Sequence, residues 1–305
     1  MQFTWNVDPI IVNLGWGLTL RYYGIIFALV FLGGFALYRW QILRAGGTLD
    51  DVYAFVLPGA IGCIVGARLG HVFFYEPLHA LEDPLWILQT WKGGLASHGA
   101  LIGLALAVWY WSRRVGQPFA ECGDRFIFTA ALGSALVRLG NFFNSEIMGR
   151  VTDQTWGVRF PRYDLLLPPD QIPLRHPSQL YEAGLGFLVL FLLLWADRRL
   201  GREQRPRGAL SALFLITYFT GRFLVEFFKE RQVLPSSFPL DMGQLLSIPA
   251  VAIGIIWLYR SLRRPTPAHW TTITLEVGPR GRTSRSGSDK KARKKTNGKG
   301  GSRKQ

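Results

Sequence analysis

Residues 178–196 read SQLYEAGLGFLVLFLLLWA, a run of 19 residues in which Glu182 is the only charged side chain. A helix rises about 1.5 Å per residue, so this run is long enough to cross the roughly 30 Å hydrocarbon core of a bilayer. Further apolar runs of comparable length occupy residues 21–40, 51–75, 95–111, 125–144, 209–228 and 240–259. The sequence therefore predicts an all-α integral membrane protein with seven transmembrane helices.

The composition excludes an ordinary water-soluble enzyme. Of the 305 residues, 49% are hydrophobic and only 18% are charged, whereas soluble domains carry about 25% charged residues. Most of the formal net charge of +15 comes from residues 280–305, where eleven Lys and Arg face one acid, Asp289. We therefore divide the chain into a membrane domain, residues 1–264, and a basic, disordered cytoplasmic tail, residues 265–305.

The cysteine count excludes two further kinds of structure. With only Cys63 and Cys122, the chain has neither a disulfide framework nor a metal site of four thiolates. No spacing of His, Cys, Asp and Glu suggests another metal site, and we expect no cofactor and no nucleic-acid partner.

Basic residues in the short loops predict the orientation of the chain, because cytoplasmic loops carry an excess of Lys and Arg. They gather at or just after the ends of the first, third, fifth and seventh runs: Arg39, Arg44, Arg113, Arg114, Arg198, Arg199, Arg202, Arg205, Arg207, Arg260, Arg263 and Arg264. We therefore expect the N-terminus outside and the C-terminus in the cytoplasm. The exterior segment of residues 145–177 is too long for a turn and is predicted to form a small extracytoplasmic head between the fourth and fifth helices.

Polar residues inside the apolar runs lie at a similar depth, near the outer ends of six predicted helices. They are Tyr23, Arg68, His71, His98, Arg138, Asn141, Gln179, Glu182, Arg222 and Glu226. A charged side chain in a bilayer costs at least about 2.5 kcal/mol, so such residues indicate a functional site. Several cations without a matching excess of acids favour an anion, and the arginine fork matches the oxygens of a phosphate. For Arg68 and His71, contact with lipid headgroups or structural ion pairing is an equally good interpretation.

Two local spacings sharpen this prediction. Tyr218, Arg222 and Glu226 are four residues apart and share one helix face, which places Glu226 to orient Arg222. Arg138 and Asn141, followed by Asn144, form a second polar stripe at intervals of three. His98 follows a glycine-rich entry to its helix and is interpreted as functional rather than structural.

Seven motifs recur along these stretches. The central motif, residues 138–150, reads RLGNFFNSEIMGR. The six others are RYYG at 21–24, GARLG at 66–70, GGLASHG at 93–99, RHPSQLYE at 175–182, GRFLVEF at 221–227 and DMGQLLS at 241–247. In sequence and in order, these motifs resemble those of the bacterial prolipoprotein diacylglyceryl transferases. The resemblance covers roughly residues 10 to 262. Val137 departs from it, because the family usually has glycine there, and the tail has no required counterpart.

The resemblance implies a transferase of the bacterial inner membrane. Such enzymes move the diacylglyceryl group of phosphatidylglycerol onto the thiol of the lipobox cysteine of a preprolipoprotein, forming a thioether and releasing glycerol phosphate. This is the first step of lipoprotein maturation, and its active site faces the outer leaflet. Because the thiol arrives with the substrate, no catalytic cysteine is expected in the enzyme.

We hypothesise that Arg138 and Arg222 hold the phosphate, with Tyr23 and Asn141 completing the cavity. His98 is either the base that takes the thiol proton or a hydrogen-bonding group that positions a substrate. The remaining expected substrate-binding residues are Asn144, Glu146, Gly149, Arg68, Tyr218, Glu226, His176 and Gln179.

Other classes of membrane protein remain as alternatives. A phospholipid flippase or an anion transporter could also use intramembrane arginines. Transporters, however, usually show repeated halves and helix breaks near the midplane, and the sequence has no internal repeat. An intramembrane protease would need a Ser/His arrangement or a pair of carboxylates at matching depth, and none is evident.

Overall fold

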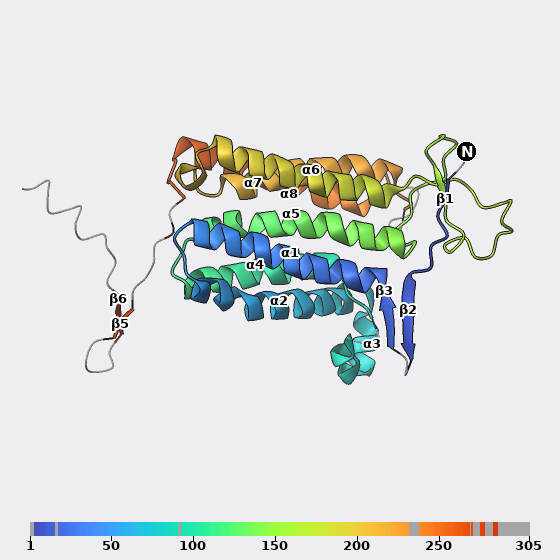
Figure 1. The fold of residues 1–305 in the computed structure, drawn as a ribbon, viewed down its shortest axis with the longest axis horizontal. Coiled ribbons are helices and arrows are strands. Elements are labelled where there is room, and N and C mark those ends of the chain that lie inside the picture. Colours follow the sequence, from blue (N-terminus) through green and yellow to red (C-terminus); the bar gives the residue numbers. More distant parts are fainter. Residues whose placement is uncertain are drawn as a thin grey trace, which may run out of the picture.

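A computed structural model describes residues 3–15, 18–90, 93–231, 238–268, 270, 275–277 and 283–285 of the chain. In this part of the chain, seven long helices form an elongated bundle (Figure 1). They are α1 (Tyr22–Arg44), α2 (Leu49–Tyr75), α4 (Ser97–Arg114), α5 (Phe119–Phe143), α6 (Ser178–Arg199), α7 (Ala209–Val225) and α8 (Met242–Arg263). All except α4 are long and apolar enough to cross a membrane, α7 together with the short helix η4 (Glu226–Phe228) that continues it. The predicted helical, multi-pass membrane fold is confirmed at this level.

Helix α5 occupies the centre of the bundle. It packs against α1, α4, α6 and α7, and Figure 1 shows it between a layer of α1, α2 and α4 and a layer of α6, α7 and α8. Buried apolar side chains such as Phe128, Leu193 and Leu210 fill the space between α5, α6 and α7. The central position matters because the longest motif of the sequence, residues 138–150, begins in the last turns of α5.

Helices α2 and α4 approach each other closely through glycines. A Cβ atom at Gly66 would lie 2.4 Å from the carbonyl oxygen of Gly99, and one at Gly62 would lie 2.5 Å from that of Gly103. Only glycine permits this backbone contact, and small residues are the usual means by which helices associate in a bilayer. The close contact holds α4 alongside α2.

The two ends of the bundle differ in structure. At the head end, where α5 and α7 finish and α6 begins, lie three short strands of the N-terminal segment: β1 (Phe3–Thr4), β2 (Ile10–Gly15) and β3 (Leu18–Arg21). The same end carries α3 (Pro77–Glu82), η1 (Pro84–Leu88) and β4 (Val158–Arg159). At the opposite tail end, α1, α4, α6 and α8 finish, and η3 (Arg202–Gln204) lies between α6 and α7.

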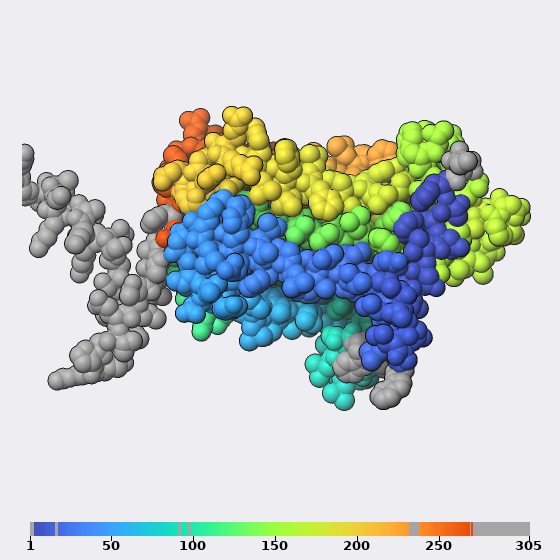
Figure 2. Space-filling model, in the orientation of Figure 1, coloured from blue at the N-terminus to red at the C-terminus, as the bar shows by residue number. Residues whose placement is uncertain are grey.

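Residues 145–177 are folded over the head end. β4 pairs in parallel with β1, and Met148, Val158 and Phe160 are buried around Phe142 of α5. Figure 2 shows the N-terminal residues, in dark blue, lying against the yellow-green head. The contribution of β1 was not predicted, because two residues of strand carry too weak a sequence pattern to reveal a partner 150 residues away.

A network of buried charges closes the tail end. Its members are four carboxylates and four arginines: Glu121, Asp124, Asp197, Glu203, Arg44, Arg125, Arg205 and Arg207. Asp124 is fully buried and accepts hydrogen bonds from the backbone N–H groups of Gly208 and Ser211, both at 2.8 Å, where α7 begins. Arg44, Arg205 and Arg207 are therefore internal ion-pair partners as well as loop charges.

After α8, Ala268 and Trp270 are also packed against the bundle. The backbone N–H of Ala268 donates to the carbonyl of Arg205 at 2.9 Å. Trp270 is only 4% exposed, its ring lies 5.6 Å from that of Trp111, and its indole N–H donates to Asp51 at 3.3 Å. The packed domain thus extends past the predicted boundary at residue 264. The composition of the following residues is polar, but the burial of the Trp270 side chain stabilises their attachment to the bundle. Beyond Trp270, the structure describes only β5 (Leu275–Val277) paired with β6 (Thr283–Arg285); the rest of the predicted tail lies outside the described residues.

A chain ending after Trp270 is expected to keep the thermal stability of the full protein, whereas one ending after Arg264 should unfold at a lower temperature. Loss of a buried tryptophan side chain typically costs about 3–5 kcal/mol. The apparent unfolding temperature of both truncated proteins in the same detergent would measure the difference. Equal temperatures would show that Trp270 does not stabilise the tail end.

Candidate functional site

The ends of three helices bring buried charges together at the head end. Arg138 lies near the end of α5, Glu182 in the second turn of α6, and Arg222 in the last turn of α7. The Nε atom of Arg138 lies 2.8 Å from Oε2 of Glu182, and Nη1 of Arg222 contacts Oε1 of the same carboxylate. Two arginines from different helices therefore meet at one carboxylate.

Two residues at the end of α7 complete what we call the charge cluster: Arg138, Glu182, Arg222, Glu226 and Lys229. The Nζ atom of Lys229 lies 3.3 Å from Glu226 and 3.6 Å from Glu182, and Nη2 of Arg222 lies 3.8 Å from Glu226. The Lys229 side chain is only 6% exposed. This burial lowers its pKa, while the neighbouring carboxylates act in the opposite direction.

The charge cluster contains three cations and two carboxylates, which leaves one positive charge in excess. This count agrees with the sequence interpretation of cations in excess of acids, although Glu182 and Glu226 pair with all three cations. The pairing through Glu182 was not predicted, because Glu182 enters the cluster from α6, a contact that spacing along the sequence cannot show. Each arginine has five N–H donors, so donors not directed at Glu182 remain for an anion.

Sequence reasoning also missed Lys229 as a member of the site. The available signal was Glu226, three residues earlier, because residues at that spacing lie on one helix face. Glu182 was noted at the correct depth but was given no role.

A polar rim continues from the cluster to the end of α5. Nη1 of Arg138 donates to the Asn141 side-chain oxygen at 3.4 Å, and the Asn141 amide donates to Glu146 at 3.2 Å. The Asn144 amide donates to the other oxygen of Glu146 at 3.1 Å. The structure thus links four of the predicted site residues in one chain of contacts.

Two tyrosines flank the cluster. Tyr23 packs on Gly140 of α5, where a Cβ atom would lie 2.8 Å from the tyrosine ring. Tyr218 precedes Arg222 by one turn of α7 and stacks on Phe214, with ring centroids 5.1 Å apart.

Arg68 has a different set of partners. Its guanidinium donates to the backbone carbonyls of Ile87 at 2.8 Å and Gly93 at 2.9 Å, and it lies 4.1 Å from the centroid of the Trp86 ring. These contacts hold the segment after α3 against α2. The contacts of Arg68 therefore stabilise the fold, and its side chain is not part of the charge cluster.

Gln179 and Gly149 attach the head to the start of α6. The Gln179 amide donates to the Glu146 carbonyl at 2.7 Å, and a Cβ atom at Gly149 would lie 2.1 Å from the His176 carbonyl oxygen. The backbone of His98 belongs to the first turn of α4, but its side chain lies outside the described residues. Its predicted role therefore stays a prediction.

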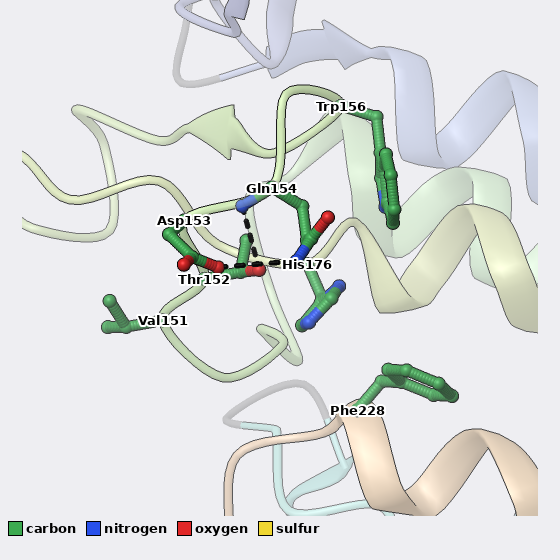
Figure 3. A pocket seen from close by; sticks show the side chains of 7 residues that line it. All are labelled: Val151, Thr152, Asp153, Gln154, Trp156, His176 and Phe228. Carbon is green, nitrogen blue, oxygen red and sulfur yellow. Dashed lines mark hydrogen bonds between the residues drawn. The ribbon is translucent and has the colours of Figure 1, made fainter.

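His176 lines a separate cavity of about 680 Å³ that we call the head pocket. Its lining residues are Val151, Thr152, Asp153, Gln154, Trp156, His176 and Phe228. Figure 3 shows the rings of Trp156, His176 and Phe228 along one side of the pocket, with Val151 and Asp153 on the other. Burial lowers the pKa of His176, so the ring is neutral at pH 7.

Among the described residues, no three His, Cys, Asp or Glu side chains gather where they could hold a metal ion.

Comparison with known proteins gives consistent matches along most of the chain. The family model for prolipoprotein diacylglyceryl transferase matches residues 9–260. A phosphatidylglycerol--prolipoprotein diacylglyceryl transferase of Chloroherpeton thalassium is 42% identical over 85% of this chain and 94% of its own length. Proteins of the same name from Pseudoalteromonas atlantica and Tolumonas auensis are 39% and 41% identical, covering 91% and 97% of their own lengths. These matches confirm the resemblance seen in the motifs.

Proposed function

This chain belongs to the prolipoprotein diacylglyceryl transferase family, and we propose that its charge cluster is where the transfer takes place. The protein is a membrane-bound transferase that moves the diacylglyceryl group of phosphatidylglycerol to prolipoprotein during lipoprotein maturation. The observation that supports this location is the meeting of Arg138 and Arg222 on Glu182 at the head end.

The reaction concentrates negative charge on a phosphate. The sulfur of the lipobox cysteine forms a bond to the glyceryl carbon, and the bond from that carbon to the phosphate oxygen breaks. The thiol proton passes to a base, and the bonding electron pair leaves on the oxygen. A phosphodiester with one negative charge thus becomes glycerol phosphate, whose second charge is largely developed at pH 7 because its second pKa is about 6. Fixed donors aimed at this phosphate lower the barrier.

Arg138 and Arg222 are the donors placed for that role. Glu182 contacts both guanidinium groups and holds them in position before the lipid arrives, so it acts as a positioning residue. Glu226 holds Arg222 and Lys229 in the same way. The positive charge in excess is available to the anionic headgroup.

The thiol needs help to react, because its usual pKa of about 8.5 leaves it mostly protonated at neutral pH. His98, at the start of α4, is either the base or a group that positions the substrate. Tyr23 and Asn141 complete the phosphate cavity, with Tyr218 as a further substrate contact. Gln179, which is fully buried, supports the cavity by holding the backbone of Glu146. Asn144, Glu146 and Gly149 shape its mouth.

We place the head end outside the cytoplasm and the tail end inside, with α4 as a seventh spanning helix beside α2. The exposed arginines at the tail end support this orientation, among them Arg113 and Arg114 at the end of α4 and Arg198 and Arg199 at the end of α6. In this orientation the charge cluster faces the outer leaflet, and residues 145–177 form an extracytoplasmic head.

The direct test uses purified protein in detergent, phosphatidylglycerol labelled in its lipid-anchored glyceryl group, and a lipobox peptide. We expect label to appear on the cysteine in equal amount to the glycerol phosphate released. A folded, lipid-binding protein that transfers no label would contradict the assignment and favour a lipid flippase or an anion transporter.

Replacing Arg222 with lysine is expected to lower kcat for transfer by at least about tenfold, because lysine keeps the charge but loses the fork that matches phosphate oxygens. The same label-transfer assay measures kcat. Arg162→Lys is the matched control, since Arg162 forms a partly exposed pair with Asp8 at 3.3 Å at the same end. A normal rate for Arg222→Lys would contradict a bidentate contact with the phosphate.

A further inference from the structure

The transfer step derived above does not use the head pocket. We propose that this pocket binds the polypeptide substrate, at residues that follow the modified cysteine. The inference deepens the proposed function and rests on it, because it assumes that the cysteine thiol reacts at the charge cluster.

The pocket and the charge cluster share one corner of the structure. Phe228 lines the pocket, and the next residue, Lys229, extends to Glu182 and Glu226. Consecutive Cα atoms lie about 3.8 Å apart, so the two sites are separated by little more than the backbone of this corner. A polypeptide with its cysteine at the cluster could therefore reach the pocket within a few residues.

Most of the pocket lies beyond the ends of the membrane-spanning helices, and Phe228, the last residue of the span Ala209–Phe228, forms its edge nearest the bilayer. Val151 to Trp156 belong to the folded segment of the head, and His176 precedes the first residue of α6. The part of the substrate that remains in the bilayer cannot enter a pocket placed there. The part that has left the bilayer, on the carboxyl side of the cysteine, can.

The charge of the pocket favours a polypeptide over the lipid headgroup. Asp153 is the only formally charged side chain among its lining residues, because His176 is neutral at pH 7. An anionic phosphate would meet a carboxylate and no cation. The amide side chain of Gln154 and Nε2 of His176 instead offer donors and acceptors to a neutral peptide backbone.

Two aromatic rings give the pocket its apolar contact surface. Trp156 is 58% exposed and Phe228 is 43% exposed, although both belong to a folded part of the chain. The Trp156 indole N–H donates to the Tyr181 hydroxyl at 3.0 Å, and that hydroxyl lies 3.2 Å from Nδ1 of His176. The tryptophan ring is thus held in place before binding, and exposed rings of this kind dominate the affinity of many protein interfaces.

Two lipobox peptides test the proposal in the labelled-lipid assay. The short peptide ends at the cysteine, and the long one continues for roughly six residues, about 20 Å when extended. We expect the full protein to prefer the long peptide by about tenfold in kcat/KM, and Trp156→Ala to lose most of this preference. The KM for phosphatidylglycerol should change much less than the KM for the long peptide. Leu166→Ala is the matched control, because Leu166 is 98% exposed in the same head but does not line the pocket.

A crosslinking measurement tests the same proposal without an activity assay, and it does not require that the Trp156→Ala protein folds. Benzoylphenylalanine in place of Gln154 should crosslink to the long peptide and not to the short one. The pocket assignment fails if the full protein uses both peptides equally, if Trp156→Ala keeps the preference, or if the long peptide gives no crosslink. If the full protein labels neither peptide, the proposed function itself fails.

Discussion

Replacing Arg138 with alanine is expected to lower kcat/KM for diacylglyceryl transfer by about a thousandfold. Removal of one fixed donor to a developing anion typically costs about two to three orders of magnitude in rate. In this protein the change also leaves Arg222 and Lys229 against Glu182 and Glu226, so the positive charge in excess disappears. Both effects act on the phosphate and reinforce each other.

The rate would be measured by label transfer to a lipobox peptide, after confirming that the variant inserts and unfolds like the parent. Arg162→Ala serves as the control, because an exposed ion pair contributes at most about 1 kcal/mol. If Arg138→Ala retained more than about a tenth of the parent activity, the phosphate would have to be bound elsewhere.

Replacing Asp124 with alanine is expected to destabilise the protein strongly, by about 3–5 kcal/mol, which is the usual cost of removing one partner from a buried ion pair. Asp124 accepts three hydrogen bonds where α7 begins, from the N–H groups of Gly208 and Ser211 and from the Ser211 hydroxyl. Its loss leaves these donors unpaired and removes a carboxylate 3.6 Å from the buried Arg205.

The apparent unfolding temperature in detergent would report this loss. Asp50→Ala is the matched control: Asp50 is exposed in the first turn of α2, at the same end of the bundle, where a carboxylate contributes about 0.3–1 kcal/mol. An Asp124→Ala protein as stable as the parent would mean that the tail-end network contributes little to the stability of the bundle.

Spacing within a helix predicted the parts of the site that lie on one helix. The four-residue interval from Arg222 to Glu226 indicated a shared face, and the structure places their side chains 3.8 Å apart. The three-residue interval from Arg138 to Asn141 corresponds to a hydrogen bond. Such predictions succeed because the helical period is local and the same in every helix.

Contacts between helices could not be predicted in the same way. Glu182 and Lys229 share the depth of the arginines, yet nothing in the sequence shows that Glu182 joins Arg138 to Arg222. Arg68 has the same depth and charge, but it turns to the carbonyls of residues 87 and 93. Depth along a helix follows from residue number, whereas the direction in which a side chain faces depends on how the helix packs.

The sequence by itself determined the membrane fold, the family and the end of the bundle at which the polar residues gather. The length of an apolar run follows from the thickness of the bilayer. The order of the motifs can be read along the chain without knowing how the helices pack. The tertiary structure decided the pairing of the charges, the attachment of Trp270 and β1 to the bundle, and the head pocket beside the charge cluster. Each of these depends on how helices and strands that are distant in the chain are rotated and packed against each other. The spacing of residues within one helix does not contain that information.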